Sequence, residues 1–180
     1  SLVDGYNIST GFVKSNFERK YNNDFGYYLH LHGSPLFVGD PGKKLNRADL
    51  ASHMPNDAKH IILSDGAMKP YLIQRSNILN LYWDQLSVCI EEAQEVILFG
   101  YGGGDDHLNE RLAEAEDTKK WVVEWSQSMH TLPDSDVSQG KNVSASDFWT
   151  TKLGENVVIR GRDNILDFDA WDNPDDFPPF

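Results

Sequence analysis

Residues Glu95–His107 read E-V-I-L-F-G-Y-G-G-G-D-D-H, and this stretch decides the fold that we expect. The apolar run Val96–Phe99 is rich in β-branched and aromatic side chains, which is typical of a parallel strand buried on both faces. Four glycines follow between residues 100 and 104, and Asp105 and Asp106 are then candidate N-caps of a helix. In α/β proteins, a strand, a glycine turn and a helix start lie in this order at the carboxyl edge of the sheet, where ligands bind.

Further strands and helices are predicted on both sides of this stretch. A helix is expected at Asn77–Ala93, with Ser76 as its N-cap, because apolar residues recur there at helical spacing. Strands are predicted at Tyr27–His32, His60–Ser64, Trp121–Trp125 and Asn156–Arg160, and a long surface loop at Gln127–Asp147. Because strands and helices alternate, we predict an α/β fold of the three-layer, Rossmann-like type. It would have a mostly parallel sheet of about five strands centred on Val96–Phe99, with helices on both faces.

Composition narrows the classes of function. A chain of 180 residues can bury one sizeable core, so we expect a single domain that ends in an acidic and aromatic tail over residues 163–180. The net charge of −12 argues against nucleic acid and anionic membranes as partners. The single cysteine, Cys89, excludes an intrachain disulfide and a multi-cysteine zinc site. No apolar run approaches the roughly 20 residues that span a bilayer, and no cleavable signal pattern opens the chain, so a cytoplasmic protein is expected.

Two histidines and a serine lie at the end of the first predicted strand. On an extended strand, His30 and His32 would point to the same side, Gly33 would let a ligand approach, and Ser34 would supply a hydroxyl. A histidine at a carboxyl edge can act as a general base near neutral pH. Spacing alone also allows a structural role, in which both histidines are half-buried and hydrogen-bonded.

The glycine-rich turn is not a dinucleotide fingerprint and lacks the ending of a phosphate-cradling loop. Because Asp105 and Asp106 would repel phosphate, we expect the turn to bind ribose hydroxyls, while ordinary helix capping is the alternative for Asp105. Ser64 ends the neighbouring predicted strand, so it should share one crevice with the ends of the other two strands. Lys69 and Arg75 could offset phosphate charge, although exposure on a helix is the expected assignment for both.

Four motifs, taken in order, resemble those of sirtuin-like NAD-binding domains, in particular the bacterial domains of phage-defence systems. These motifs are Leu31–Ser34, Ile61–Ser64, Leu98–Gly102 and Asp106–Asn109, within roughly residues 27–112. The resemblance implies that His32 activates the nicotinamide ribose. It also implies that NAD is contacted by Gly33, Ser34, Ser64, Gly100, Tyr101, Gly102, Asp106 and His107. Gly102 stands where the family has a serine.

Two departures from the family shape the functional hypotheses. Nothing before Tyr27 resembles the family's glycine-rich first βα unit, so the chain is expected to represent the C-terminal half of such a domain. The four cysteines of a zinc ribbon are missing between His32 and His60, which favours NAD hydrolysis over deacetylation, without zinc.

Three functions follow from this pattern. The first is an NAD-consuming hydrolase, or the NAD-binding part of one, acting in phage defence. The second is a non-catalytic module that senses a nucleotide or ADP-ribose. The third and weakest is a metal-dependent hydrolase that uses His30 and His32 as an H-x-H pair with Asp105 or His107. A small-molecule nucleotide is the expected partner, with a second copy of the chain or an effector protein as further candidates.

Overall fold

The computed structural model describes residues 2–4, 6–7, 11–12, 26–38, 43–45, 60–62, 68–134 and 137–164. The chain forms two compact units, Ser1–Cys89 and Ile90–Phe180, and each has its own buried core. Within the described ranges, no helix combines the length and the apolar character needed to cross a membrane. Ser64 and residues 165–180 of the predicted tail lie outside the described residues.

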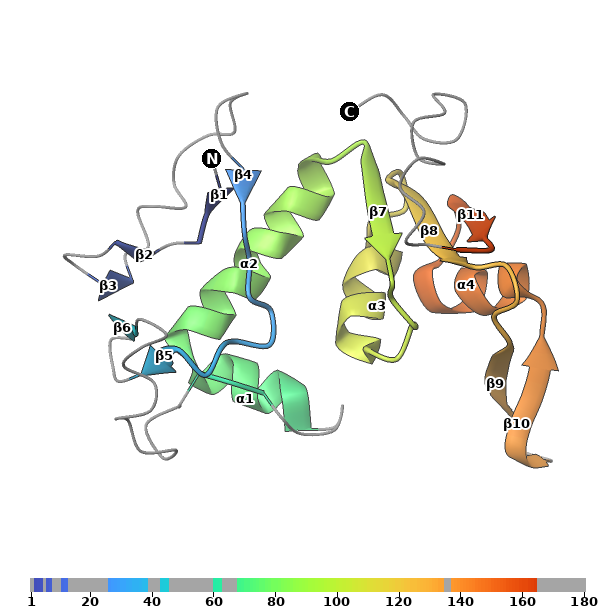
Figure 1. Cartoon of the computed structure of the whole chain (residues 1–180), viewed down its shortest axis with the longest axis horizontal. Helices are drawn as coiled ribbons and strands as arrows, with labels where there is room; N and C mark the ends of the chain where they lie inside the picture. The colour runs from blue at the N-terminus through green and yellow to red at the C-terminus, as the bar shows by residue number, and fades with distance from the viewer. Residues whose placement is uncertain are drawn as a thin grey trace. The chain divides into compact units, whose positions relative to one another are not determined.

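A three-stranded parallel sheet forms the centre of the second unit. β8 (Lys119–Trp125) lies between β7 (Glu95–Phe99) and β11 (Val157–Arg162), and Figure 1 shows the three strands side by side. The prediction of an α/β fold with parallel strands is confirmed here. The predicted centre is wrong, because β8 is paired along both edges and buries Trp121, Val122 and Val123. β7 is instead an edge strand of the described sheet, and Phe99 at its end is 44% exposed.

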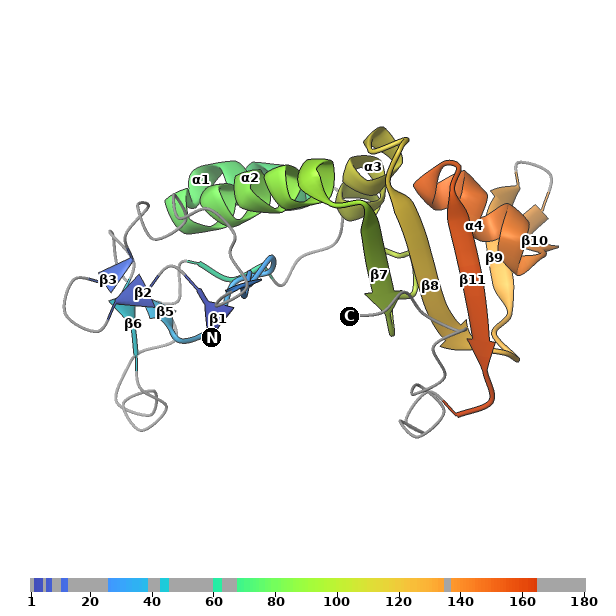
Figure 2. The same cartoon turned by 90° about the horizontal axis from the view of Figure 1, so that it is seen from above.

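Two helices lie on one face of this sheet. α3 (Asp106–Glu114) connects β7 to β8, and α4 (Ala145–Leu153) precedes β11 (Figure 2). Lys120 is fully buried on this face, where its Nζ donates hydrogen bonds to the carbonyls of Ala115, 2.8 Å away, and Glu155, 3.3 Å away. Ala115 is the first residue after α3 and Glu155 the second after α4, so the Lys120 side chain joins the carboxyl ends of both helices to the sheet. Helices on both faces stay a prediction.

The predicted surface loop at Gln127–Asp147 is wrong. This stretch contains the antiparallel strands β9 (His130–Asp134) and β10 (Val137–Val143), and its last residues, from Ala145 on, belong to α4. The Ser144 Oγ accepts a hydrogen bond from the Asp147 backbone N–H at 3.1 Å and caps α4. A serine three residues before an acidic residue and followed by Phe148 and Trp149 is a helix-start signal that the sequence contained.

The first unit combines short strand pairs with two helices. β1 (Leu2–Val3) is parallel to β4 (Gly26–Tyr27), whereas β2 (Tyr6–Asn7) with β3 (Gly11–Phe12) and β5 (Phe37–Val38) with β6 (Lys43–Lys44) are antiparallel. α1 (Lys69–Arg75) leads into α2 (Asn77–Glu92), whose predicted position and cap are confirmed. The Ser76 Oγ accepts from the Leu79 N–H at 3.2 Å, and α2 buries Ile78, Leu79, Tyr82 and Trp83.

Neither of the two strands predicted in this unit belongs to the three-stranded parallel sheet; β4, which includes only Tyr27 of the first one, pairs with β1. The first strand ends at Tyr27, and Leu31 and His32 lie in a turn. Of the predicted strand His60–Ser64, the described part makes only an isolated antiparallel bridge, between Ile61 and Gly33. Gly33 has a φ of +76°, which reverses the chain at this point and prevents strand continuation. The described sheet therefore has three strands, not about five.

Candidate functional site

The histidine turn, residues His30–Ser34, is fixed by hydrogen bonds to its backbone. The Gly33 N–H donates to the His30 carbonyl at 2.8 Å, and the indole N–H of Trp83 donates to the Leu31 carbonyl at 2.9 Å. Two further bonds join the turn to residues 60–62: Ile62 N–H to the His32 carbonyl, 2.9 Å, and Ser34 N–H to the His60 carbonyl, 3.2 Å. An alanine Cβ at Gly33 would lie 1.8 Å from the His60 carbonyl oxygen, so only glycine allows this close approach.

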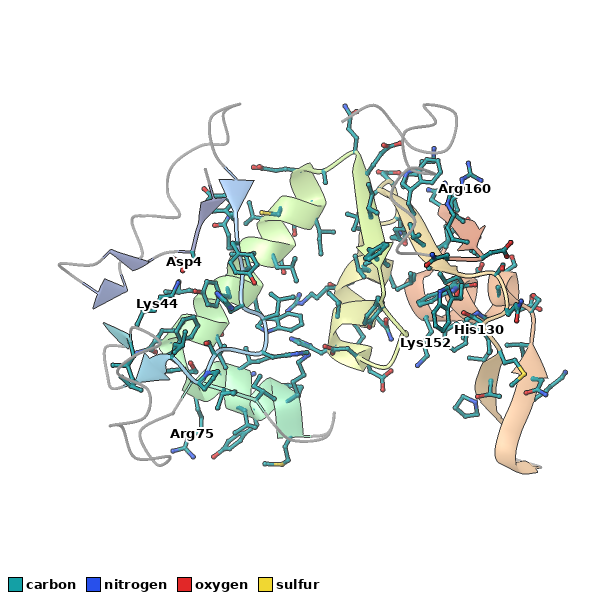
Figure 3. All side chains as sticks on the ribbon, in the orientation of Figure 1. Asp4, Lys44, Arg75, His130, Lys152 and Arg160 are labelled. Carbon is teal, nitrogen blue, oxygen red and sulfur yellow. The ribbon has the colours of Figure 1, made fainter. Side chains whose placement is uncertain are left out.

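His32 projects from the fixed turn and is exposed, as a residue that meets a ligand must be. Its Nε2 lies 2.7 Å from the Nζ of Lys69, in α1. Lys69 is only 5% exposed, and its Nζ lies 4.7 Å from the ring centroid of Trp83. The prediction that Lys69 is exposed is therefore wrong, because its stem packs into the core beside α2. Arg75 is exposed as expected and points outward from α1, over the ring of Tyr71 (Figure 3).

His30 does not point to the same side as His32, contrary to the prediction from strand spacing. Its ring packs edge-on against Tyr28 and Phe37, with centroids 4.6 and 5.1 Å apart. Burial, followed by the nearby charge of Lys44, lowers the pKa of His30, while Asp4 opposes this shift. Figure 3 shows Asp4 and Lys44 close together, and they form an ion pair. His30 is therefore neutral near pH 7 and is part of an aromatic cluster.

Ser34 is half-buried, and its hydroxyl braces the histidine turn. The Ser34 Oγ accepts from the Leu36 N–H at 3.2 Å, and the Ser34 carbonyl accepts from the Phe37 N–H at 3.0 Å. The Ser34 Oγ accepts in the first bond, and its hydroxyl donates to no acceptor among the described residues, so the hydroxyl hydrogen can bond to a ligand. The assignment of Ser34 to cofactor binding stays a prediction. Within the described part of the chain, no group of three or more His, Cys, Asp or Glu side chains could hold a metal ion.

The glycine turn, residues Gly100–Gly104, is braced from within the second unit. The hydroxyl of Tyr101 lies 2.8 Å from the Oδ1 of Asn109 and 3.0 Å from the Asp105 carbonyl, and it accepts from the Asp105 N–H at 3.2 Å. Burial raises the pKa of Tyr101 to about 12. Gly103 has a φ of +70° and lies against the rings of Phe148 and Trp149. Tyr101 therefore stabilises the turn, and its predicted contact with NAD stays a prediction.

The two aspartates after the glycine turn have different roles. The Oδ1 of Asp105 accepts from the Leu108 N–H at 3.2 Å, so Asp105 is the N-cap of α3, as the capping alternative predicted. The side chain of Asp106 is 77% exposed and pairs with Lys152 of α4 at 3.0 Å. His107 is half-buried in the first turn of α3. Asp106 is thus an accessible carboxylate beside the glycine turn, which suits an acceptor for ribose hydroxyls.

A buried carboxylate and histidine near the glycine turn were missed by sequence reasoning. One oxygen of Glu124, near the end of β8, accepts from the Trp149 indole N–H at 2.8 Å and lies 3.0 Å from the His130 Nε2. The His130 ring stacks on Phe148 with centroids 4.6 Å apart, and Figure 3 shows it beside α4. The Glu124 and His130 side chains are only 11% and 10% exposed. The contacts within this cluster have no local signal, because they join side chains of β8, β9 and α4; only the start of α4 was signalled, by Ser144 and Asp147.

A cavity of about 220 Å³ opens at the carboxyl ends of β8 and β11. It is lined by Trp125, Ser126, Gln127, Arg162 and Asp163, and Trp125 is 59% exposed. A larger hollow of about 520 Å³ lies at the opposite edge, beside the amino ends of the same strands. The smaller cavity lies at the carboxyl edge, where parallel sheets bind their ligands, so it is the better candidate of the two for a ligand pocket.

The sequence-predicted residues therefore fall into two groups. His32, Gly33 and Ser34 belong to the first unit, while Gly100, Tyr101, Gly102, Asp106 and His107 belong to the second, and Ser64 is not described. A common crevice that combines both groups stays a prediction. No family model matches the chain, and neither a curated protein nor a solved structure matches it.

Proposed function

We propose that the chain is the NAD-binding part of an NAD-consuming hydrolase that cleaves the nicotinamide–ribose bond. The observation that carries the proposal is the histidine turn, which holds an exposed imidazole on a backbone fixed by hydrogen bonds. Such fixed placement is what a general base requires, because small displacements from the reacting proton cost much of its effect. The resemblance of this turn to the sirtuin-like motif supplies the substrate class.

In this proposal, His32 accepts a proton from a ribose hydroxyl or from water. Water adds to the ribose carbon as its bond to nicotinamide breaks, so the products are nicotinamide and ADP-ribose. The sirtuin-like resemblance assigns ribose contacts to Asp106, whose carboxylate is exposed, and to Gly102, both in the second unit. A Cβ at Gly102 would meet no atom of the described residues within 4 Å, so these residues leave space there for a ligand.

A second candidate function is a sensor that binds a nucleotide or ADP-ribose without turnover. One observation favours it: the Nε2 of His32 is occupied by the Nζ of Lys69, 2.7 Å away. A base whose lone pair is engaged in this way does not act until that contact is released.

The test is nicotinamide release from NAD by the protein that contains this chain. General-base catalysis contributes about 10²–10⁴-fold, so His32→Ala should lower turnover by that factor with a modest effect on binding. Asp106→Ala should mainly raise the Michaelis constant. Arg75→Ala is the matched control, since Arg75 is exposed on α1 and belongs to neither turn, and circular dichroism checks folding.

Three outcomes separate the candidates. Equal turnover by His32→Ala and the wild type would reject the catalytic assignment. Binding of NAD or ADP-ribose without any nicotinamide release would favour the sensor. Neither binding nor release would reject both functions.

A further inference from the structure

Lys69 is joined to the candidate catalytic histidine by a direct contact between side chains. Its Nζ lies 2.7 Å from the Nε2 of His32, and the same Nζ lies 4.7 Å from the ring centroid of Trp83. Trp83 in turn donates to the carbonyl of Leu31 in the histidine turn. The Lys69 side chain is buried, whereas His32, which its ammonium contacts, is exposed. The ammonium therefore lies at the edge of the core.

The chemistry of the two groups determines the direction of this hydrogen bond. An ammonium group has three N–H donors and no acceptor, so the His32 Nε2 accepts and its ring proton is assigned to Nδ1. The lone pair of Nε2 is the one that faces Lys69. While the contact persists, Nε2 cannot also accept a proton from a ribose hydroxyl.

We propose that Lys69 restrains His32 in the unliganded chain and binds the diphosphate of a nucleotide, which releases the histidine. The proposal rests on the proposed function. A phosphate oxygen is an anionic acceptor and attracts an ammonium more strongly than a neutral imidazole does. The flexible four-carbon stem lets Nζ move while the rest of the side chain stays against Trp83. Lys69 is thus a phosphate-binding and positioning residue, which couples recognition of the diphosphate to the availability of the base.

The test follows the imidazole nitrogens of His32 by ¹⁵N NMR while ADP-ribose, adenosine or inorganic pyrophosphate is added. In the wild type, ADP-ribose and pyrophosphate should shift the Nε2 signal, because each removes its donor, whereas adenosine should leave it unchanged. This arm needs no variant, so it stands even where a substitution impairs folding.

Lys69→Met provides the second arm, with Arg75→Met as the matched control. Methionine keeps an apolar stem against Trp83 and removes the ammonium. The Nε2 signal of unliganded Lys69→Met should already differ from that of the wild type. Affinity for ADP-ribose should fall about 10- to 100-fold, the effect of one hydrogen bond to a charged group, and affinity for adenosine should be unchanged. Arg75→Met should bind ADP-ribose as the wild type does.

Two results would overturn the proposal and leave the nucleotide function intact. One is ADP-ribose binding that leaves the His32 signals unchanged, and the other is equal affinity of Lys69→Met and Arg75→Met for ADP-ribose. If ADP-ribose does not bind the wild type, the proposed function fails instead. Pyrophosphate then decides the role of Lys69 alone: a shifted Nε2 signal keeps the anion site, and an unchanged one rejects it.

Discussion

Replacing Gly103 with alanine should destabilise the second unit by about 1–5 kcal/mol. Gly103 has a φ of +70°, and this left-handed conformation costs alanine about 1–2 kcal/mol. The new Cβ would lie 3.0 Å from Phe148 Cε1 and 3.2 Å from Trp149 Cζ3, and overpacking of this kind costs about 1–3 kcal/mol. The lower entropy of the unfolded alanine chain offsets about 0.4–1 kcal/mol of this total.

The same turn contains two matched controls. Gly100 also has a positive φ, +64°, but its Cβ would meet no atom of the described chain within 4 Å, so Gly100→Ala should cost only about 1 kcal/mol. Gly102 lacks a positive φ, and none of the described residues lies within 4 Å of its added Cβ, so Gly102→Ala should change stability by less than about 0.5 kcal/mol. The three variants thus separate the conformational cost from the packing cost.

Urea unfolding followed by tryptophan fluorescence measures these differences, since Trp149 lies against Gly103. Equal destabilisation by Gly103→Ala and Gly100→Ala would refute the packing of the glycine turn on α4. If Gly103→Ala were as stable as Gly102→Ala, the left-handed conformation would be refuted as well.

Three further variants test the interior of the two units by urea unfolding. Glu124→Gln should cost about 1–3 kcal/mol, because the His130 Nε2 lies within 3.1 Å of both carboxylate oxygens and an amide would place an NH2 donor at one of these two positions. The pKa of His30 is lowered in the folded state, so below about pH 6.5 the unfolded chain binds the proton more readily. The stability of the wild type should therefore fall as the pH is lowered from about 8 to about 5. His30→Leu should remove this part of the loss, so its stability should fall less over the same range. Lys120→Met should cost about 1–3 kcal/mol at pH 7, because two carbonyls lose their donor. Burial lowers the pKa of Lys120, so wild-type stability should rise toward the lysine range near about pH 10 and the deficit of the variant should grow.

The elements that sequence reasoning located well are those whose signals are local. The apolar run of β7, the cap at Asp105 and the apolar face of α2 each lie within a few residues of the structure they specify. Propensity, capping and periodicity act over this range, so one chain is sufficient to interpret them. Residues 144–149 carried an equally local capping signal, and α4 could have been found from it.

The failures arose where distant segments determine the backbone. The run Tyr27–His32 alternates as a strand should, but the bond from Ile62 to the His32 carbonyl and the reversal at Gly33 hold its end in a turn. Lys69 was expected in solvent because lysine usually is, and its burial depends on Trp83, in a different helix. Neither partner could be identified from the local sequence of either residue.

The geometry of the histidine turn argues against one of the three functional hypotheses, the metal-dependent hydrolase. As an H-x-H pair on a strand, His30 and His32 could together ligate a metal ion. In the structure, aromatic rings pack around the imidazole of His30. The ammonium of Lys69 lies 2.7 Å from the Nε2 of His32. A divalent cation bound at that nitrogen would face strong repulsion from the ammonium, whereas an anionic nucleotide would be attracted to it. The contact between Lys69 and His32 therefore opposes a metal site at this nitrogen and is compatible with the phosphate-bearing ligand that we propose.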